Sequence, residues 1–379
     1  MKIGFDGRFI RQGQTGNGVF TQLLLEGLAR LDDENEYTVY LLEDKLLIQK
    51  DNFRLKRMPF LHASSHLRFL LTFPLELWRN PVDIFHAIYT IPLRTSARVV
   101  LTLVEFSWLI NPEEFPASPL FLSQLRLMTR HSIHRADRII TPTWVGRNEL
   151  LSYFDLPEEK VEVIHFGFND VFLEPCEREE IDRIKQRYGI ASHYLLSVGD
   201  LHPRKNLIRL IEAFSWLKET QRISHQLVLV GKDLWRAEEI YRKASSCSAR
   251  DSIVFTGYIP IEELKALYQG ATLFAFPSLN EGFGLPVHEA MASRLPVIVS
   301  DRGALPEVAG NAALVVDPLN VEEIGWAIFR VLDSPTLRKE LVRKGLEQIQ
   351  AFSWEESCRK TLRLYQNVCS TGCEERRRR

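Results

Sequence analysis

The feature that most constrains the fold is a regular alternation of short β-rich runs with longer amphipathic stretches along nearly the whole chain. Residues 19–31, for example, place their apolar side chains on one face at helical spacing and lie between two β-rich runs. Such alternation is typical of parallel sheets that are covered by helices on both faces. The sequence therefore predicts an α/β protein.

The predicted strands fall into two groups. The first group is residues 3–5, 37–42, 84–86, 99–104, 138–141 and 161–164. The second group is residues 194–198, 227–230, 253–255, 273–276, 297–299 and 313–315, and only helical patterns follow, at 321–332, 336–350 and 354–368. Two Rossmann-like domains that face a cleft, followed by C-terminal helices, fit this order.

The strand signals stop over residues 168–188, where a charged stretch intervenes, and a length of 379 residues suits two domains. The last helix could pack on either domain, so a return to the N-terminal domain is one of two alternatives. The expected order is an N-terminal domain (1–170), a linker (171–190), a C-terminal domain (191–352), a final helix (353–370) and a charged solvated tail (371–379).

Composition excludes several classes of protein. Lys plus Arg is 48 and Asp plus Glu is 49, so the net charge of -1 offers no global field for a nucleic acid. The five cysteines are odd in number and lack C-x-x-C spacing, which favours reduced thiols over disulfides or a zinc site. The first residues hold too short an apolar run for a signal peptide, and no stretch resembles a membrane span. These observations predict a cytoplasmic protein without a zinc site.

The strongest local motif, PSLNEGFGLPVHEAMA at residues 277–292, follows an apolar run and precedes a helix that Pro286 can open. Gly282 and Gly284 let the backbone come close to a ligand, and helix N-terminal amides suit a phosphate. Glu281 would be repelled by a phosphate, so we expect it to reach past the anion to hydroxyl groups, and Glu289 to serve a second polyol. A nucleotide sugar has that layout. The structural alternative is a capped helix whose acids complement the helix dipole.

A second element, at residues 194–207, is a buried strand followed by Arg204 and Lys205 at the mouth of a helix. Cations are disfavoured at a helix N-terminus, so structure alone gives little reason for this pair. A bound diphosphate would supply one.

The stretch from Glu281 to Glu289 resembles the E-x7-E signature of retaining, nucleotide-sugar-dependent glycosyltransferases of family 4, which have the GT-B fold of two Rossmann-like domains. Further blocks resemble the family in the same order, at residues 136–141, 198–206, 228–232, 303–308 and 352–356. The resemblance covers nearly the whole chain.

The resemblance implies a role for each matching residue. Arg204 and Lys205 would grip the donor diphosphate, Glu281 the donor sugar and Glu289 the ribose. The backbone of Tyr258 and Ile259 would form the nucleobase rim. Glycine and amide positions near the phosphates would be Gly16 and Gly18, in a loop that closes over the diphosphate or is a bare turn, together with Gly282, Phe283, Gly284 and Leu285.

Two departures from the family bear on the donor. Asp200 stands where many members have an arginine, so Arg204 must carry that role. Val104 stands where the related block commonly has a histidine near the sugar's C6 end, which favours a 6-deoxyhexose or a pentose unless His86 takes over the hydroxyl. We expect His86, at a strand end, to face the cleft as a catalytic candidate, the alternative being a satisfied core histidine.

Residues 50–79 interleave basic and aromatic side chains, which suits a peripheral membrane contact, and a solvated helix with a core face is the alternative. As a whole, the resemblance implies retaining transfer of a sugar from a nucleoside-diphosphate sugar to a glycan or lipid-linked acceptor hydroxyl. The resemblance also implies that the donor is a co-substrate and that the protein needs no cofactor and no bound metal. The alternatives are a sugar-nucleotide epimerase or phosphorylase of the same fold, or a non-catalytic sugar-nucleotide-binding subunit.

Overall fold

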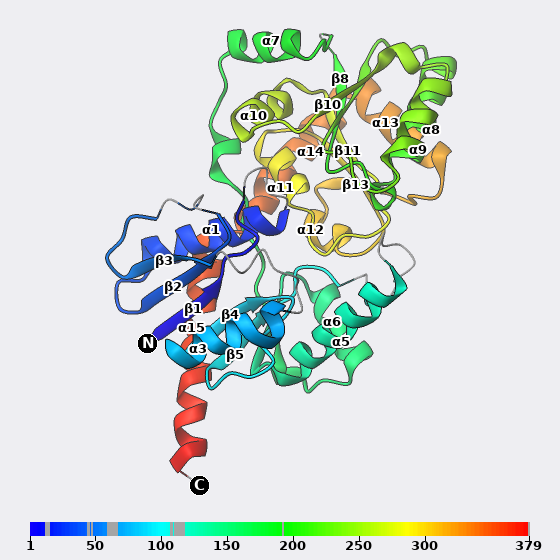
Figure 1. Cartoon of the computed structure of the whole chain (residues 1–379). Helices are drawn as coiled ribbons and strands as arrows, with labels where there is room; N and C mark the ends of the chain where they lie inside the picture. Colours follow the sequence, from blue (N-terminus) through cyan, green and yellow to red (C-terminus); the bar gives the residue numbers. More distant parts are fainter. Residues whose placement is uncertain are drawn as a thin grey trace. The chain divides into compact units, whose positions relative to one another are not determined.

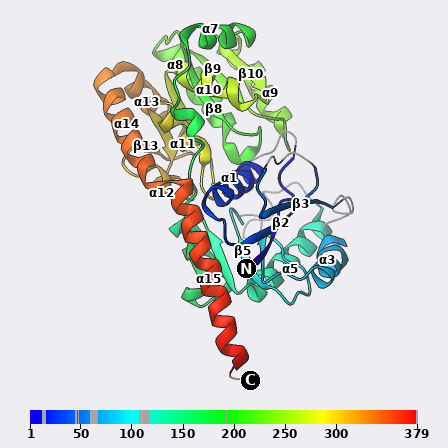
Figure 2. The ribbon, with the colours of Figure 1, turned by 90° about the vertical axis from the view of Figure 1, so that its left-hand side faces the viewer.

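The computed structural model describes residues 1–11, 16–43, 46, 48–58, 67–106, 109, 118–191 and 193–377. The chain divides into two compact units (Figures 1 and 2). Unit 1 is Met1–Gly167 together with Phe352–Arg379, and unit 2 is Phe168–Ala351. Each unit contains its own parallel sheet, so the predicted fold class is confirmed.

Unit 1 is built on a seven-stranded sheet with the order β3-β2-β1-β4-β5-β6-β7. Its strands are β1 (Lys2–Asp6), β2 (Glu36–Leu41), β3 (Phe53–Arg57), β4 (Ile84–Ile88), β5 (Arg98–Thr102), β6 (Arg138–Thr141) and β7 (Val161–Val163). Its helices are α1 (Gly16–Leu31), the π-helical segment η2 (Arg68–Thr72), α3 (Phe73–Arg79), α5 (Pro119–Arg135), α6 (Trp144–Phe154) and α15 (Trp354–Arg377). Side-chain caps define two helix starts, because Ser118 accepts from the Phe121 amide and Thr143 from the Gly146 amide.

Strand β3 is absent from the sequence prediction. Its residues, FRLKR, pair in parallel with β2 at the edge of the sheet, and only Phe53 is fully buried. Charged side chains on an edge strand protect its unpaired edge from other strands. They also leave few apolar residues in the strand, so the sequence shows no clear alternation of apolar and polar positions. Residues 50–79 therefore contain an edge strand as well as a helical segment.

Unit 2 is built on a six-stranded parallel sheet with the order β10-β9-β8-β11-β12-β13. Its strands are β8 (Tyr194–Val198), β9 (Gln226–Val230), β10 (Ile253–Gly257), β11 (Leu273–Phe276), β12 (Val297–Ser300) and β13 (Ala313–Val316). Its helices are α7 (Arg178–Arg187), α8 (Leu207–Thr220), α9 (Ala237–Ser246), α10 (Ile261–Gly270), α11 (Leu285–Ala292), α12 (Leu305–Ala309), α13 (Val321–Asp333) and α14 (Pro335–Gln348). The strand order reverses between β8 and β11, which is where open α/β sheets bind ligands.

The expected linker at 171–190 is wrong, because this segment is part of unit 2. It contains the short helix η5 (Asp170–Leu173) and α7, and α7 packs on α10. At the end of α7, the Arg187 guanidinium and the Tyr188 hydroxyl each donate to a carboxylate oxygen of Glu263, both at 2.6 Å. The charges that suggested a linker instead lie on a solvated helix face.

The final helix α15 belongs to unit 1, where it packs on α1. Its Tyr365 hydroxyl lies 2.5 Å from His86 Nδ1 in β4, and Trp354 stacks on Phe166 with ring centroids 5.8 Å apart. The helix continues to Arg377, so most of the expected solvated tail at 371–379 is helical (Figure 2).

The contact between α1 and α15 depends on the absence of a side chain at Gly27. A Cβ placed there would lie 2.5 Å from Cys358 Sγ, whereas a Cβ at Gly16, in the same helix, would meet nothing within 4 Å.

We expect Gly27→Ala to lower the melting temperature in calorimetry, because overpacking a core contact costs about 1 to 3 kcal/mol. Gly16→Ala is the matched control and should change it little. Equal effects of the two changes, or no recovery when Cys358→Ala is added to Gly27→Ala, would show that this contact is not tight.

Candidate functional site

The candidate site lies at the carboxyl edge of the unit 2 sheet, where the strand order reverses. Arg204 and Lys205 follow β8 in a short turn, η6 (Pro203–Lys205), and Glu281 lies in the loop between β11 and α11. Because β8 and β11 are neighbours, the two loops meet at this point. Residues far apart in the sequence therefore form one site, as the motif analysis predicted.

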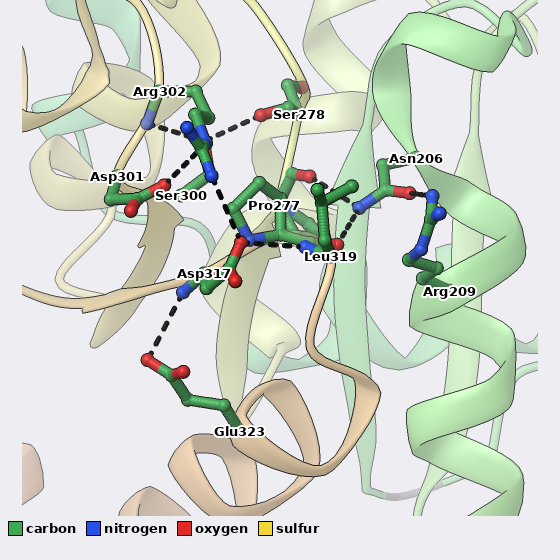
Figure 3. A network of polar contacts seen from close by, with 11 residues as sticks. Asn206, Arg209, Pro277, Ser278, Ser300, Asp301, Arg302, Asp317, Leu319 and Glu323 are labelled. Carbon is green, nitrogen blue, oxygen red and sulfur yellow. Dashed lines mark hydrogen bonds and ion pairs between the residues drawn. The ribbon is translucent and has the colours of Figure 1, made fainter.

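The turn that carries the two cations is held from both ends. The imidazole Nδ1 of His202 accepts from the Arg204 amide at 3.1 Å, and burial, followed by the nearby cations, lowers the pKa of His202 to about 4. Asn206 has a left-handed backbone (φ 57°), and its side-chain amide donates to the carbonyls of Pro277 at 3.0 Å and Pro318 at 2.6 Å. Figure 3 shows Asn206 joined in this way to the loops after β11 and β13.

The loop after β12 completes this support. The Ser300 hydroxyl donates to the Ser278 carbonyl at 2.6 Å (Figure 3). At Gly303, which has a φ of 56°, an added Cβ would lie 2.8 Å from the carbonyl oxygen of Glu281 and 2.9 Å from its amide nitrogen. The backbone that presents Glu281 is therefore held by contacts from the turn after β8 and from the end of β12 with the loop that follows it.

Glu281 makes ion pairs with both cations. Its Oε2 lies 2.8 Å from Nη1 of Arg204, and its Oε1 lies 2.6 Å from Nζ of Lys205. The exposed fractions of the three side chains are 8%, 16% and 13%. Burial by itself would raise the pKa of Glu281, but the charges of Arg204 and Lys205 outweigh it and lower that pKa to about 2. Glu281 is therefore ionised at all physiological pH values.

This ion pair corrects part of the sequence argument. The cations were taken to need a bound diphosphate as their partner, and the structure supplies Glu281 instead. Arg204 also donates to the Asn280 carbonyl at 2.6 Å, and Lys205 Nζ lies 4.7 Å from the centre of the Phe276 ring. Two cations nevertheless face one carboxylate, so this buried group keeps a net positive charge that favours an anion.

The N-terminus of α11 adjoins the loop that carries Glu281. Gly284 precedes the helix with a φ of 97°, and a Cβ there would lie 2.8 Å from Leu305, so a side chain would be both strained and obstructed. Pro286 is in the first turn, as predicted. Gly282 and Phe283 come just before the helix, and Leu285 is its first residue. The first amides of a helix have no hydrogen-bond partner within it, so they can bind a ligand.

Glu289 lies in different surroundings from Glu281. It is on α11 and partly buried, and its Oε2 accepts from the Tyr268 hydroxyl at 2.9 Å. Burial raises the pKa of Glu289 to about 7, with only partial compensation from that hydrogen bond. The two glutamates of the motif therefore differ in charge state near neutral pH.

The predicted nucleobase rim lies on the same edge of the sheet. Tyr258 follows β10 and is half exposed, while Ile259 is buried. The Lys232 ammonium, just after β9, lies 4.7 Å from the centre of the Tyr258 ring. Asp200, found in place of the family's arginine, accepts from the Lys232 amide at 3.4 Å and so supports this turn.

Two predictions about unit 1 need correction. His86 lies inside β4 with no exposed surface, and its ring nitrogens contact Tyr365 at 2.5 Å and Thr102 at 2.7 Å. Burial lowers its pKa to about 3, so it is a neutral core histidine and not a catalytic residue facing solvent. Gly16 and Gly18 lie in the first turn of α1, where a loop or a bare turn was expected.

Sequence reasoning missed a second polar group at the carboxyl edge of the unit 1 sheet. Arg8 lies 3.3 Å from Asp6 and donates to the Ile88 carbonyl at 2.5 Å and the Thr90 hydroxyl at 3.0 Å. Between the last two, Tyr89 has a φ of 66° and donates from its hydroxyl to Asn17 at 3.1 Å. Asn206 and His202 were also missed, although polar residues at a helix start are a recognisable capping signal.

Metal binding and membrane crossing can be addressed for the described part of the chain. There, no group of three His, Cys, Asp or Glu side chains could hold a metal ion. In the same residues, no helix has both the length and the apolar character needed to cross a bilayer. Metal independence stays a prediction.

Comparison with known proteins identifies the class. The family model "Glycosyl transferases group 1" matches residues 180–348, and the model "Glycosyltransferase Family 4" matches residues 15–171. O-antigen chain mannosyltransferase B of Escherichia coli is 31% identical over 269 residues, which are 71% of this chain and 70% of that protein. The chain therefore belongs to the family 4 glycosyltransferases.

Solved structures show the same fold. Sucrose-phosphate synthase from Thermosynechococcus elongatus matches with a TM-score of 0.79 and 20% identity, over 98% of this chain and all of that one. HepE of Anabaena, solved in complex with UDP and glucose, matches with a TM-score of 0.75 and 18% identity, over 97% of this chain and all of that one. The GT-B architecture expected from the sequence is confirmed.

The raised pKa of Glu289 predicts a pH dependence of stability. Between pH 4.5 and about 7, folded Glu289 keeps a proton that the unfolded chain releases, so its contribution to stability should fall as pH rises and level off above 7. We expect the difference in the free energy of unfolding between the parent and Glu289→Gln to decline across this window by on the order of 1 to 3 kcal/mol. Glu347→Gln, at an exposed pair with Arg343, is the control. A constant difference across the window would contradict the assignment.

Proposed function

We propose that this glycosyltransferase moves a sugar from a nucleoside-diphosphate sugar to a hydroxyl of a glycan or lipid-linked acceptor, with retention of the anomeric configuration. The observation that carries the proposal is the buried group of Glu281, Arg204 and Lys205 at the reversal point of the unit 2 sheet. The related mannosyltransferase supports a role in surface polysaccharide synthesis, and the UDP and glucose bound to HepE support a nucleotide-sugar donor. A cytoplasmic location belongs to the same proposal.

The chemistry follows from the charges of the site. In the proposed complex, Arg204 and Lys205 donate charged hydrogen bonds to the diphosphate and stabilise the negative charge that develops as it leaves. The N-terminal amides of α11 add to this stabilisation.

The two glutamates have separate roles in this proposal. Glu281 exchanges its ion pairs for hydroxyl groups of the donor sugar, and it is already ionised and fixed in place. Glu289 binds the ribose hydroxyls through its carboxyl oxygens, one of which, Oε2, accepts from the Tyr268 hydroxyl at 2.9 Å in the structure. The site offers no clear enzymic nucleophile, so we propose front-face transfer in which the leaving phosphate takes the proton of the acceptor.

Binding of UDP or GDP, measured by calorimetry, tests the competition between Glu281 and the diphosphate for the two cations. Glu281→Gln should bind the nucleotide about 5- to 30-fold more tightly, because removing the internal anion is worth about 1 to 2 kcal/mol, while turnover falls. Lys205→Ala should weaken binding by about 1.5 to 3 kcal/mol, the scale of a charged hydrogen bond. Glu347→Gln again serves as the control, because it removes an exposed carboxylate that pairs with Arg343 and with neither cation of the site.

Unchanged affinity in both site variants would show that the diphosphate binds elsewhere.

Product analysis separates a transferase from an epimerase, a phosphorylase and a non-catalytic binding subunit. A transferase gives an acceptor-dependent glycoside whose anomeric configuration, read by NMR, matches the donor. An epimerase or phosphorylase would convert the donor without a glycan acceptor, and a binding subunit would bind it without turnover.

The identity of the donor sugar is a separate prediction. Val104 is partly buried just after β5, and in place of the family's histidine it favours a 6-deoxyhexose or a pentose, whereas the mannosyltransferase relative favours a hexose. His86 cannot take over the 6-hydroxyl, because both of its nitrogens are occupied in the core. A donor panel on the parent and on Val104→His should show a shift toward 6-hydroxy sugars in the variant. Equal use of mannose donors by both proteins would remove the role of Val104.

A further inference from the structure

The segment formed by Leu67, η2 and α3 carries apolar side chains on both its inner and its outer face, although it lies at the surface of unit 1. Its inner face, Phe69, Phe73 and Leu77, is buried. Its outer face exposes Leu67, Leu70, Leu71, Leu75 and Trp78, with exposed fractions of 45%, 47%, 53%, 49% and 78%. The outer residues follow helical spacing, so they form one stripe along the segment. A helix that is apolar all round is normally covered on both faces.

Helix α5 continues this exposed apolar surface. Leu120 and Leu127 are 69% and 71% exposed, and both share a helical stripe with His131. The ring of His131 packs edge-on against the ring of Phe69 in η2, with ring centroids 5.5 Å apart, so this stripe of α5 borders the apolar segment. The Leu93 amide donates to the Phe69 carbonyl at 2.9 Å, and Leu93 is itself exposed.

We refer to the exposed residues of these elements as the apolar face: the four leucines and the tryptophan of the first stripe, with Leu93, Leu120, Phe121 and Leu127. Together they are nine of the 18 large apolar side chains that are exposed in the described residues. Such concentration on adjoining elements marks an interaction surface, since single exposed apolar residues are ordinarily scattered.

The charge around the apolar face has one sign. Residues 67–80 and 118–135 contain five arginines and a single carboxylate, Glu76. Glu76 is 12% exposed and is paired with Lys56 at 2.6 Å. Exposed Arg79 ends the first stripe, and exposed Arg94 follows Leu93. Because the whole chain has a net charge of -1, this excess of cations is local.

We propose that the apolar face lies on an anionic lipid bilayer, with its leucines and Trp78 in the acyl boundary and its arginines among the headgroups. Apolar side chains flanked by cations are the composition that binds such a surface. A second copy of the chain is disfavoured as the occupant, because two faces of the same positive charge would repel each other. The proposal goes beyond sugar transfer and does not depend on it.

The structure also changes which residues make this contact. The sequence suggested residues 50–79, but β3 is part of the sheet. Lys50 pairs with Asp33 at 2.7 Å, and Lys56 is held by Glu76. The basic residues before position 58 are thus partly engaged within the fold, and α5, which carries no sequence motif of this kind, takes their place.

Flotation of the full chain with phosphatidylcholine vesicles, with and without phosphatidylglycerol, tests the proposal. We expect recovery only with the anionic vesicles, falling with added salt because headgroup attraction is screened. Leu71→Ser with Trp78→Ser should reduce binding at least tenfold. The matched control, Leu319→Ser with Trp326→Ser, removes similarly exposed apolar residues from unit 2 and should leave binding unchanged.

The arginines can be tested separately. Arg79→Gln and Arg94→Gln should each weaken binding about fivefold, the effect of about 1 kcal/mol for one cation near an anionic surface. Arg183→Gln, a 73% exposed arginine of α7, is the control. Quenching of tryptophan fluorescence by brominated lipid, compared between the parent and Trp78→Phe, reports the same contact if the double serine variant fails to fold.

Three results would overturn the proposal. The first is equal recovery with neutral and anionic vesicles, and the second is no recovery with either. The third is a concentration-dependent dimer that Leu71→Ser with Trp78→Ser disrupts, which would assign the apolar face to a second copy of the chain.

Discussion

The site depends on one buried carboxylate. Removing Glu281 from water is unfavourable by several kcal/mol, and only two cations and a fixed backbone make its ionised form stable there. Arg204 and Lys205 supply the charge, and Arg204 also holds the adjacent Asn280 carbonyl. The reversal of strand order between β8 and β11 brings these three residues together. Glu281 thus acts as the counter-ion of both cations, and in the proposed function it exchanges these partners for the donor sugar.

The same motif places two glutamates under opposite electrostatic conditions. Glu281 is paired with two cations, which lower its pKa to about 2, whereas Glu289 accepts from the Tyr268 hydroxyl and its burial raises its pKa to about 7. A polyol donor suits both arrangements, since hydroxyl groups can donate to a carboxylate and accept from a carboxylic acid. The separation of their charge states gives a physical reason for assigning them to different parts of one ligand.

Unit 1 is held together by a different device. The helix α15 returns from the end of unit 2 to pack on α1, and its Tyr365 reaches the buried His86 of β4. This contact uses a glycine at position 27 to bring two helices close and a neutral histidine to satisfy a buried hydroxyl.

Local patterns were sufficient to predict most strands and to single out Arg204, Lys205 and Glu281, which the structure brings together. Apolar runs such as 227–230 and 273–276 are strands because their side chains are buried on both faces, which leaves a strong signal. The edge strand β3 gave no such signal, because its charged side chains alternate with only a few buried ones.

The sequence by itself determined the α/β class, the positions of Glu281, Glu289, Arg204 and Lys205, and the start of α11 at a glycine and a proline. These features depend on short-range spacing, which one stretch of chain contains. Only the tertiary structure decided that Glu281 neutralises the two cations, that His86 is a core residue, that 171–190 belongs to unit 2 and that α5 extends the apolar face. Each of these depends on which distant residues become neighbours, and that information lies in the packing of elements and not in the spacing within any one of them.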